Sequence, residues 1–147
     1  YRYETINTKV RSLFRGSKRV DKLVPGGSTS IETELDMVLG KSDTLAGNVV
    51  SIKGKLPALT QQLKIKYKLF SEAFSASDKI NVEQIKHSEL LLLSINTYLT
   101  GGIVSLLKQS EFEILLKTPL VAFKGDNVGI ARNIGGHWRL IGSGKIV

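Results

Sequence analysis

The chain contains no cysteine and only two histidines among its 147 residues. Without thiols it can form no disulfide, build no zinc finger and use no cysteine nucleophile. Acidic residues are also scarce, because 13 Asp and Glu stand against 21 Lys and Arg and leave a net charge of +8. Such an excess attracts polyanions, most often RNA, although a solvated basic surface accounts for the charge equally well.

Long hydrophobic runs are missing as well, since the longest apolar stretch, residues 90–93, holds only four leucines. This is far too short to cross a membrane, and we expect no membrane partner. No signal peptide pattern is present, and the chain opens at Tyr1 in a strand-like pattern without an initiator methionine. We therefore expect part of a longer cytoplasmic protein, with a real core because 41% of the residues are hydrophobic.

Alternation of polar and apolar residues dominates the chain and predicts β-strands. In residues 62–69, period two puts Leu63 and Ile65 on one face and Lys64, Lys66 and Lys68 on the other. Glycine-rich turns separate short segments of this kind, which is typical of β-barrels and β-sandwiches. Residues 71–83 are polar and mixed, so we expect a loop or a short helical turn there. Further strands are predicted at residues 29–35, 49–52, 90–95, 103–107, 112–116, 128–134 and 138–141.

A domain boundary is predicted near Pro57, where proline follows a Gly/Lys-rich stretch that favours extended linker backbone. The two parts are residues 1–56 and residues 57–147. The first is small for a closed barrel, which suggests an incomplete domain.

Several motifs then occur in a fixed order. They are Val24-Pro25-Gly26-Gly27, Thr100-Gly101-Gly102, Gly125-Asp126-Asn127-Val128-Gly129-Ile130-Ala131-Arg132 and His137-Trp138-Arg139-Leu140-Ile141-Gly142. In this order they resemble the second and third domains of the gamma subunit of eukaryotic and archaeal translation initiation factor two. The resemblance covers nearly the whole chain, although Ser28-Thr29-Ser30-Ile31 departs from the family's Gly-Leu-Ile-Gly-Val-like run.

The resemblance implies an all-β chain of two translational-GTPase-type β-barrels, with no G domain. Residues 1–56 would be the C-terminal part of the domain II barrel and residues 57–147 the domain III barrel. A group of family-motif residues would then be structural: Gly101, Gly102, His137, Trp138, Arg139 and Gly142.

The parent family binds GTP and magnesium, but this chain has no Gly-x-x-x-x-Gly-Lys-[Ser/Thr] motif. Gly26-Gly27-Ser28-Thr29 has no following lysine and is expected to open a strand, not a helix. We therefore expect no cofactor and no catalysis in this chain, with GTP and Mg held by a G domain of the parent protein.

The function that the resemblance implies is GTP-dependent delivery of initiator methionyl-tRNA to the small ribosomal subunit. The implied partners are that tRNA, the alpha and beta subunits of the factor, the small ribosomal subunit, and an ATP-grasp assembly chaperone on domain III. The alternative is the C-terminal barrels of an elongation factor of the Tu or selenocysteine-specific type. A stand-alone barrel enzyme ranks last, because no convergent set of titratable residues is evident.

Candidate contact residues concentrate in the first third of the chain. The resemblance places a tRNA-binding wall at Ser12, Phe14, Arg15, Gly26, Gly27 and Ser28. A basic cluster, expected to contact RNA phosphates if residues 15–22 form a loop, comprises Arg11, Lys18, Arg19 and Lys22. For two aromatic candidates near the C-terminus we favour structural roles over functional ones. His137 would start a strand at the barrel rim, and Trp138 would be a core residue rather than a base-stacking platform.

Overall fold

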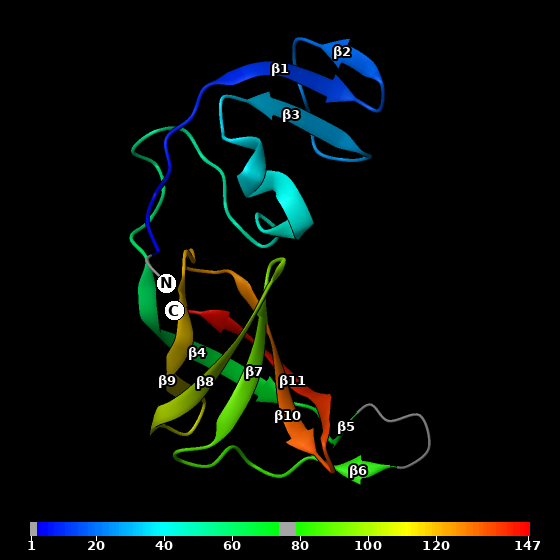
Figure 1. Ribbon diagram of the computed structural model, residues 1–147. Coiled ribbons are helices and arrows are strands. Elements are labelled where there is room, and N and C mark those ends of the chain that lie inside the picture. The colour runs from blue at the N-terminus through cyan, green and yellow to red at the C-terminus, as the bar shows by residue number, and fades with distance from the viewer. Residues whose placement is uncertain (1–2, 74–78) are drawn as a thin grey trace. The chain divides into compact units, whose positions relative to one another are not determined.

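The computed structural model describes residues 3–73 and 79–147, which belong to two compact units, Tyr1–Leu45 and Ala46–Val147 (Figure 1). Both units are built on β-strands, so the all-β prediction is confirmed. One short 3-10 helix, η1 (Met37–Asp43), is the only helix in the described ranges, and no helix there is long and apolar enough to cross a membrane. The family-domain boundary between residues 56 and 57 stays a prediction.

The first unit is a three-stranded antiparallel sheet with the order β2-β1-β3. Its strands are β1 (Val10–Arg15), β2 (Lys18–Val20) and β3 (Thr29–Thr33). Residues 15–22 are not the continuous loop considered for them, because Gly16 adopts a positive φ of 59° and turns the chain into a β1–β2 hairpin. The η1 helix was not predicted; the Asp36 carboxylate caps it by accepting from the Val38 N–H at 2.9 Å.

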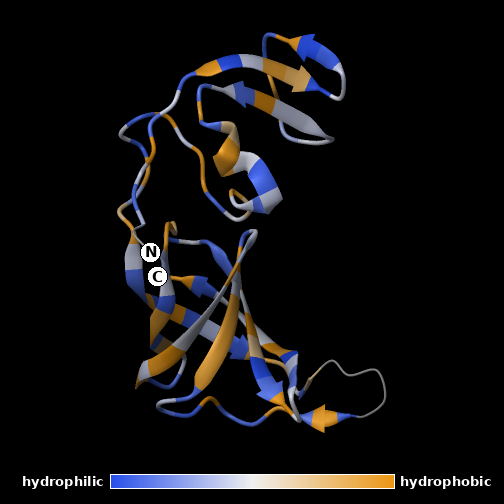
Figure 2. Ribbon diagram, in the orientation of Figure 1, coloured by the Kyte–Doolittle hydropathy of each residue, from blue (hydrophilic) through white to orange (hydrophobic). Residues whose placement is uncertain are grey.

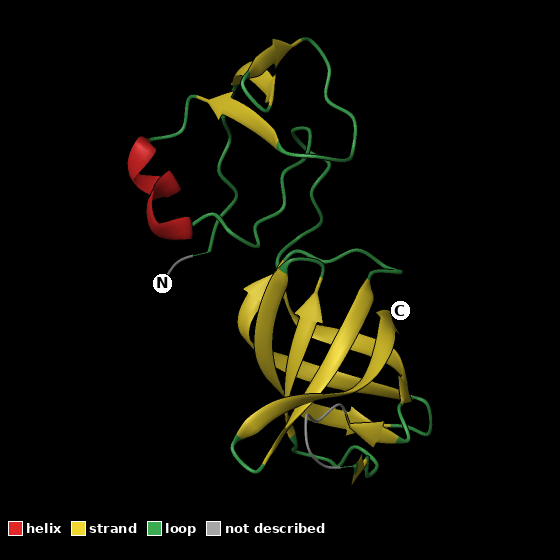
Figure 3. Ribbon diagram, turned by 90° about the vertical axis from the view of Figure 1, so that its right-hand side faces the viewer, coloured by secondary structure: helices red, strands yellow, loops and turns green. Residues whose placement is uncertain are grey.

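The second unit is a closed antiparallel barrel with the strand order β10-β11-β4-β9-β8-β7 (Figure 3). The barrel strands are β4 (Thr60–Leu69), β7 (Leu90–Ile95), β8 (Tyr98–Leu107), β9 (Glu111–Leu120), β10 (Asn127–Ile134) and β11 (His137–Ile146). Closure is made by β11, which pairs with β10 on one side and with β4 on the other. The six-stranded barrel thus has no free strand edge.

Period-two patterning fills the barrel as the sequence predicts. On β4, Leu63 and Ile65 are buried while the three lysines point outward. The core also contains buried side chains from every other barrel strand, among them Leu91, Leu93, Val104, Phe112, Ile114, Val128, Ile130 and Ile141. Glycine lets neighbouring strands approach closely at two places. A Cβ on Gly142 would lie 2.6 Å from the Lys68 carbonyl oxygen, and one on Gly144 would lie 2.7 Å from the Ile65 side chain.

The strand predicted at residues 49–52 is absent, and the prediction for residues 71–83 holds only in part. Residues 49–52 form no strand, and Val50 and Ile52 are 84% and 79% exposed, because no neighbouring strand pairs with them. Within residues 71–83, expected to be a loop or a helical turn, the structure has a ribbon of β5 (Glu72–Ala73) and β6 (Ile80–Asn81). The part of that prediction on residues 74–78 lies outside the described residues.

Candidate functional site

The predicted basic cluster maps onto the β1–β2 hairpin and the segment after it. Lys18 and Arg19 are exposed on β2, and Lys22 is exposed just beyond it. Within residues 3–73 and 79–147 no salt bridge engages these three cations. The hydropathy colouring of Figure 2 shows β2 as a hydrophilic strand. The hairpin therefore presents positive charge that is available to an outside anion.

The glycine turn predicted as part of the tRNA wall is tied to the same hairpin. Arg15 donates from Nη2 to the Val24 carbonyl oxygen at 2.9 Å, and the Gly16 N–H donates to the Ser28 carbonyl oxygen at 3.2 Å. Between these two bonds, Gly26 and Gly27 adopt φ values of 108° and 72°, which favour glycine. The structure thus brings Arg15 together with the turn at residues 26–28.

Three members of the predicted set share one face of this sheet. Phe14, half-buried, lies directly opposite Arg19 on β2 and Ser30 on β3. Ser12 shares the Phe14 face, but its side chain is buried and its hydroxyl donates to the Glu32 carboxylate. An aromatic ring beside a cation is one arrangement that contacts bases and phosphates of RNA.

Arg11 differs from the other cations of the cluster because it already has a partner. Its Nη2 lies 2.9 Å from a carboxylate oxygen of Glu34, with both side chains well exposed. An outside phosphate would have to compete with that carboxylate, so the positive charge at Lys18, Arg19 and Lys22 is more readily available.

The residues Gly26-Gly27-Ser28-Thr29 do not fit the triphosphate cradle of a GTPase. They lead into β3, whereas that cradle needs a helix N-terminus and a lysine. In the described part of the chain, no group of three or more His, Asp or Glu side chains is arranged to hold a metal ion.

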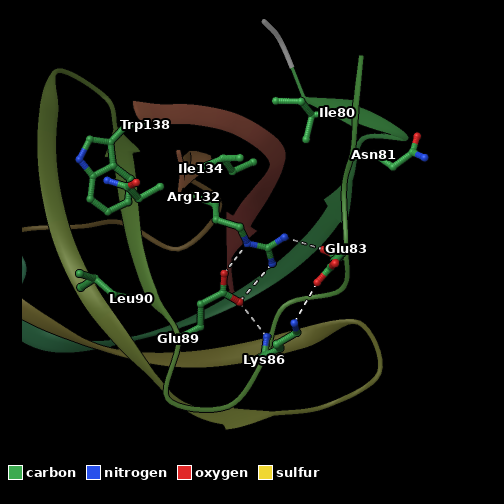
Figure 4. Close-up of a pocket in the computed structure, with 10 residues that line it drawn as sticks. Ile80, Asn81, Glu83, Lys86, Glu89, Leu90, Arg132, Ile134 and Trp138 are labelled. Carbon is green, nitrogen blue, oxygen red and sulfur yellow. Dashed lines mark hydrogen bonds and ion pairs between the residues drawn. The ribbon is translucent and has the colours of Figure 1, made fainter. Parts of the chain in front are cut away.

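A second concave site lies at one end of the barrel, in the other unit. This groove encloses about 590 Å³ and contains both apolar and charged side chains (Figure 4). Its lining residues are Ile80, Asn81, Glu83, Lys86, Glu89, Leu90, Arg132, Asn133, Ile134 and Trp138.

Arg132 forms a clasp across this groove. Its guanidinium donates to both carboxylate oxygens of Glu89, and also to the carbonyl oxygens of Glu83 at 2.9 Å and Gln84 at 3.1 Å (Figure 4). The side chains of Arg132 and Glu89 are each only 15% exposed. The clasp therefore fastens the segment before β7 to β10 and satisfies two backbone acceptors.

The rim of the groove carries a weaker ion pair. Lys86 Nζ donates to a Glu83 carboxylate oxygen at 2.9 Å, and this hydrogen bond lowers the pKa of the Glu83 carboxyl. Because both side chains are more than 70% exposed, the pair contributes little to stability.

The predicted structural-motif residues have different environments. His137 is exposed and begins β11, as predicted. The core interpretation of Trp138 is wrong, because its side chain is 43% exposed and lines the groove. Arg139 lies directly opposite Arg132, and its buried Nε has no hydrogen-bond partner in the described structure. Gly101, Gly102 and Gly142 lie within barrel strands, at positions consistent with a structural role.

The Arg132–Glu89 clasp was not predicted from the sequence. A signal exists in the alternation of β10, where Val128 and Ile130 are buried and Arg132 occupies the next inward position. A charged residue at such a position needs a partner, but the alternation does not say which residue supplies it.

Comparison with known proteins gives one consistent result. Residues 61–146 match the family model described as "Initiation factor eIF2 gamma, C terminal". The chain is 42% identical over 145 residues to translation initiation factor 2 subunit gamma of Pyrococcus horikoshii, and 40% identical over 142 residues to that of Methanococcus vannielii. These matches cover 99% and 97% of this chain but only 35% of each relative, so the chain spans about a third of their length.

Proposed function

Because this chain belongs to the gamma-subunit family of translation initiation factor 2, we propose that it helps to carry initiator methionyl-tRNA to the small ribosomal subunit. The observation that carries the proposal is the family match over residues 61–146, which coincides with the closed barrel from Thr60 to Ile146. The identity to gamma-subunit relatives extends this over 99% of the chain, through the basic sheet as well.

In this proposal the chain works in the cytoplasm as a binding part of a larger factor. Its partners are the initiator tRNA, the alpha and beta subunits, and the small ribosomal subunit, with an ATP-grasp assembly chaperone on the barrel. GTP and magnesium are bound by a G domain, in a region of the relatives that this chain does not match. The Gly26–Thr29 segment leads into β3 and does not fit a triphosphate cradle, which supports the assignment of the nucleotide to another domain.

The RNA contact is proposed for the sheet of the first unit. Lys18, Arg19 and Lys22 carry charges that no described carboxylate neutralises, so phosphates can replace their counterions at little desolvation cost. Phe14 lies beside Arg19 and offers an apolar surface to a base. Ser12 would act through Glu32 rather than by direct contact, because its side chain is buried.

The test is an RNA-binding titration of the chain at several salt concentrations. The probe is a fluorescein-labelled RNA hairpin with a single-stranded 3′ overhang, read by anisotropy. For Lys18→Ala/Arg19→Ala we expect weaker binding at low salt. The slope of log affinity against log salt should become shallower by about 1.4, since each lost single-strand phosphate contact removes about 0.7.

The matched control is Lys53→Ala/Lys55→Ala, which removes two exposed lysines outside the hairpin. It changes the net charge by the same amount, so a general charge effect would alter both variants alike. An unchanged salt slope in the hairpin variant would show that the hairpin does not take part in RNA binding.

A further inference from the structure

An uninterrupted row of exposed aliphatic side chains crosses three neighbouring strands of the barrel. Leu90 on β7 lies opposite Ile103 on β8, and Ile103 lies opposite Leu115 on β9. These three side chains are 55%, 52% and 55% exposed. In antiparallel sheets, residues directly opposite each other point to the same face, so the three form a contiguous stripe on the outside of the barrel.

The stripe ends at the groove, where β10 separates β7 from β11. Leu90 and Trp138 both line it, and Leu140 follows Trp138 on the same face of β11 (Figure 4). Trp138 and Leu140 are 43% and 40% exposed. We call the three residues of the row, Leu90, Ile103 and Leu115, the apolar belt.

Protein recognition explains such a belt better than RNA recognition does. Aliphatic side chains provide no hydrogen-bond donors for phosphates and no flat faces on which bases can stack. Contiguous exposed apolar surface on a soluble domain instead marks a contact with another protein.

The spacing of the belt favours a helix as its occupant. Neighbouring strands lie about 4.8 Å apart, whereas one turn of an α-helix rises about 5.4 Å. A helix that runs across the strands can therefore place roughly one apolar side chain per turn on each successive strand. This is the pattern of an amphipathic helix that binds through positions i, i+4, i+7 and i+11.

The charge beside the belt indicates acidic residues on one flank of that helix, the flank over Lys117. Lys117 is exposed two residues after Leu115 on the same face of β9, and no salt bridge engages it within the described residues. On the other side of Leu115, Glu113 occupies the same face and accepts a hydrogen bond from the Gln62 amide at 2.9 Å. Residues 46–147 contain 13 Lys and Arg against 7 Asp and Glu, so the second unit carries most of the chain's positive charge. A basic unit attracts an acidic partner over distance and discriminates against a basic one.

We propose that the apolar belt is a docking surface for an amphipathic α-helix of a partner protein with acidic residues along the flank that faces Lys117. The helix lies across β7, β8 and β9, its apolar side chains cover Leu90, Ile103 and Leu115, and its carboxylates meet Lys117. The surface is separate from the basic hairpin and does not depend on RNA binding there.

The test uses the whole chain and a labelled helical peptide of about 18 residues, with leucine at i, i+4, i+7 and i+11 and glutamate on one flank. A peptide of the same composition in scrambled order is the reference ligand. We expect saturable binding of the patterned peptide only. Ile103→Ser/Leu115→Ser should weaken this binding about tenfold or more, as loss of central apolar anchors does.

The matched control is Val50→Ser/Ile52→Ser, which removes two even more exposed aliphatic side chains outside the belt. It should bind like the parent chain. Lys117→Glu is a second variant that leaves the belt intact, and it should weaken the glutamate-flanked peptide but not a lysine-flanked one.

Three outcomes overturn the proposal. The first is equal binding of the patterned and scrambled peptides by the parent chain. The second is unchanged affinity in both the belt variant and Lys117→Glu. The third is a loss of RNA affinity or of self-association in Ile103→Ser/Leu115→Ser, with no effect on the peptide, which would assign the belt to nucleic acid or to a second copy of the chain.

Discussion

Two adjacent glycines on β8 should respond in opposite ways to the same substitution. A Cβ on Gly102 would lie 2.7 Å from Ile114 Cγ1 and 2.8 Å from the Leu115 carbonyl oxygen. Ile114 is fully buried, and that carbonyl belongs to the neighbouring strand β9, so neither atom can move freely. A Cβ on Gly101 would meet only the Leu91 carbonyl oxygen, at 3.9 Å.

The magnitudes follow from these distances. Gly102→Ala forces overpacking in the barrel wall, which costs about 1–3 kcal/mol. Gly101→Ala fits and reduces the freedom of the unfolded chain, which stabilises by about 0.4–1 kcal/mol. Both variants make the same chemical change, so the effect on the unfolded chain is common to both and cancels. Their difference, about 1–3 kcal/mol, isolates the steric effect.

Urea unfolding followed by the fluorescence of Trp138 measures this difference, because the chain has a single tryptophan and it lies in the barrel. In a thermal scan, each kcal/mol should shift the midpoint by about 4–8 °C for a domain of this size. Equal stabilities of Gly101→Ala and Gly102→Ala would refute the close approach of β8 and β9 on which the reasoning depends.

Three further outcomes are expected. Arg132→Met should destabilise the barrel by about 3 kcal/mol in urea unfolding, because the mostly buried Glu89 loses its cation and keeps only the hydrogen bond from the Lys86 N–H. Adding Glu89→Met should recover part of that loss, and a purely additive double variant would contradict a clasp. A hydrogen bond from Lys64 lowers the pKa of the Glu111 carboxyl and raises that of the Lys64 ammonium. Their pairing therefore stabilises fully above pH 4.5 and below pH 10.5, and it is lost as pH falls through the lowered Glu111 pKa or rises through the raised Lys64 pKa. Glu111→Gln should thus shift the urea midpoint slightly at about pH 7, and this shift should shrink as pH falls through the lowered pKa of Glu111; a shift that does not change as the pH is lowered would contradict this pairing. The purified chain should release no phosphate from GTP and magnesium, and metal-dependent turnover by homogeneous material would overturn the proposed absence of a nucleotide site.

Period-two alternation predicts the barrel strands well because one face of each strand packs into the core and the other faces water. Leu63 and Lys64 illustrate this, since one faces the core and the other faces water. The same signal fails at residues 49–52, where β-branched residues are present but no neighbouring strand pairs with them. Strand propensity describes a fit to a pleated, half-buried surface, and the local sequence does not show whether that surface exists.

The sequence predicts some residues of the candidate site and not others, for a related reason. Charge identified the basic cluster, but charge alone did not distinguish a loop from the hairpin that Gly16 turns. The Arg132–Glu89 clasp joins residues 43 positions apart, and nothing in either local sequence indicates that separation. Trp138 was assigned to the core on its size, whereas its register on β11 places it outside.

The pairing of β4 with β11 closes the barrel, and this seam has a consequence for folding kinetics. Pairing of β4 with β11 brings Ile65 next to Ile146, two residues separated by most of the second unit. Contacts of such high contact order form slowly, because loop closure must precede the interactions that reward it. Until the seam forms, β4 and β11 are open edges that could pair with another chain. Lys66 and Lys145, directly opposite each other across the seam, place charge on both edges and should suppress that aggregation while the barrel is still open.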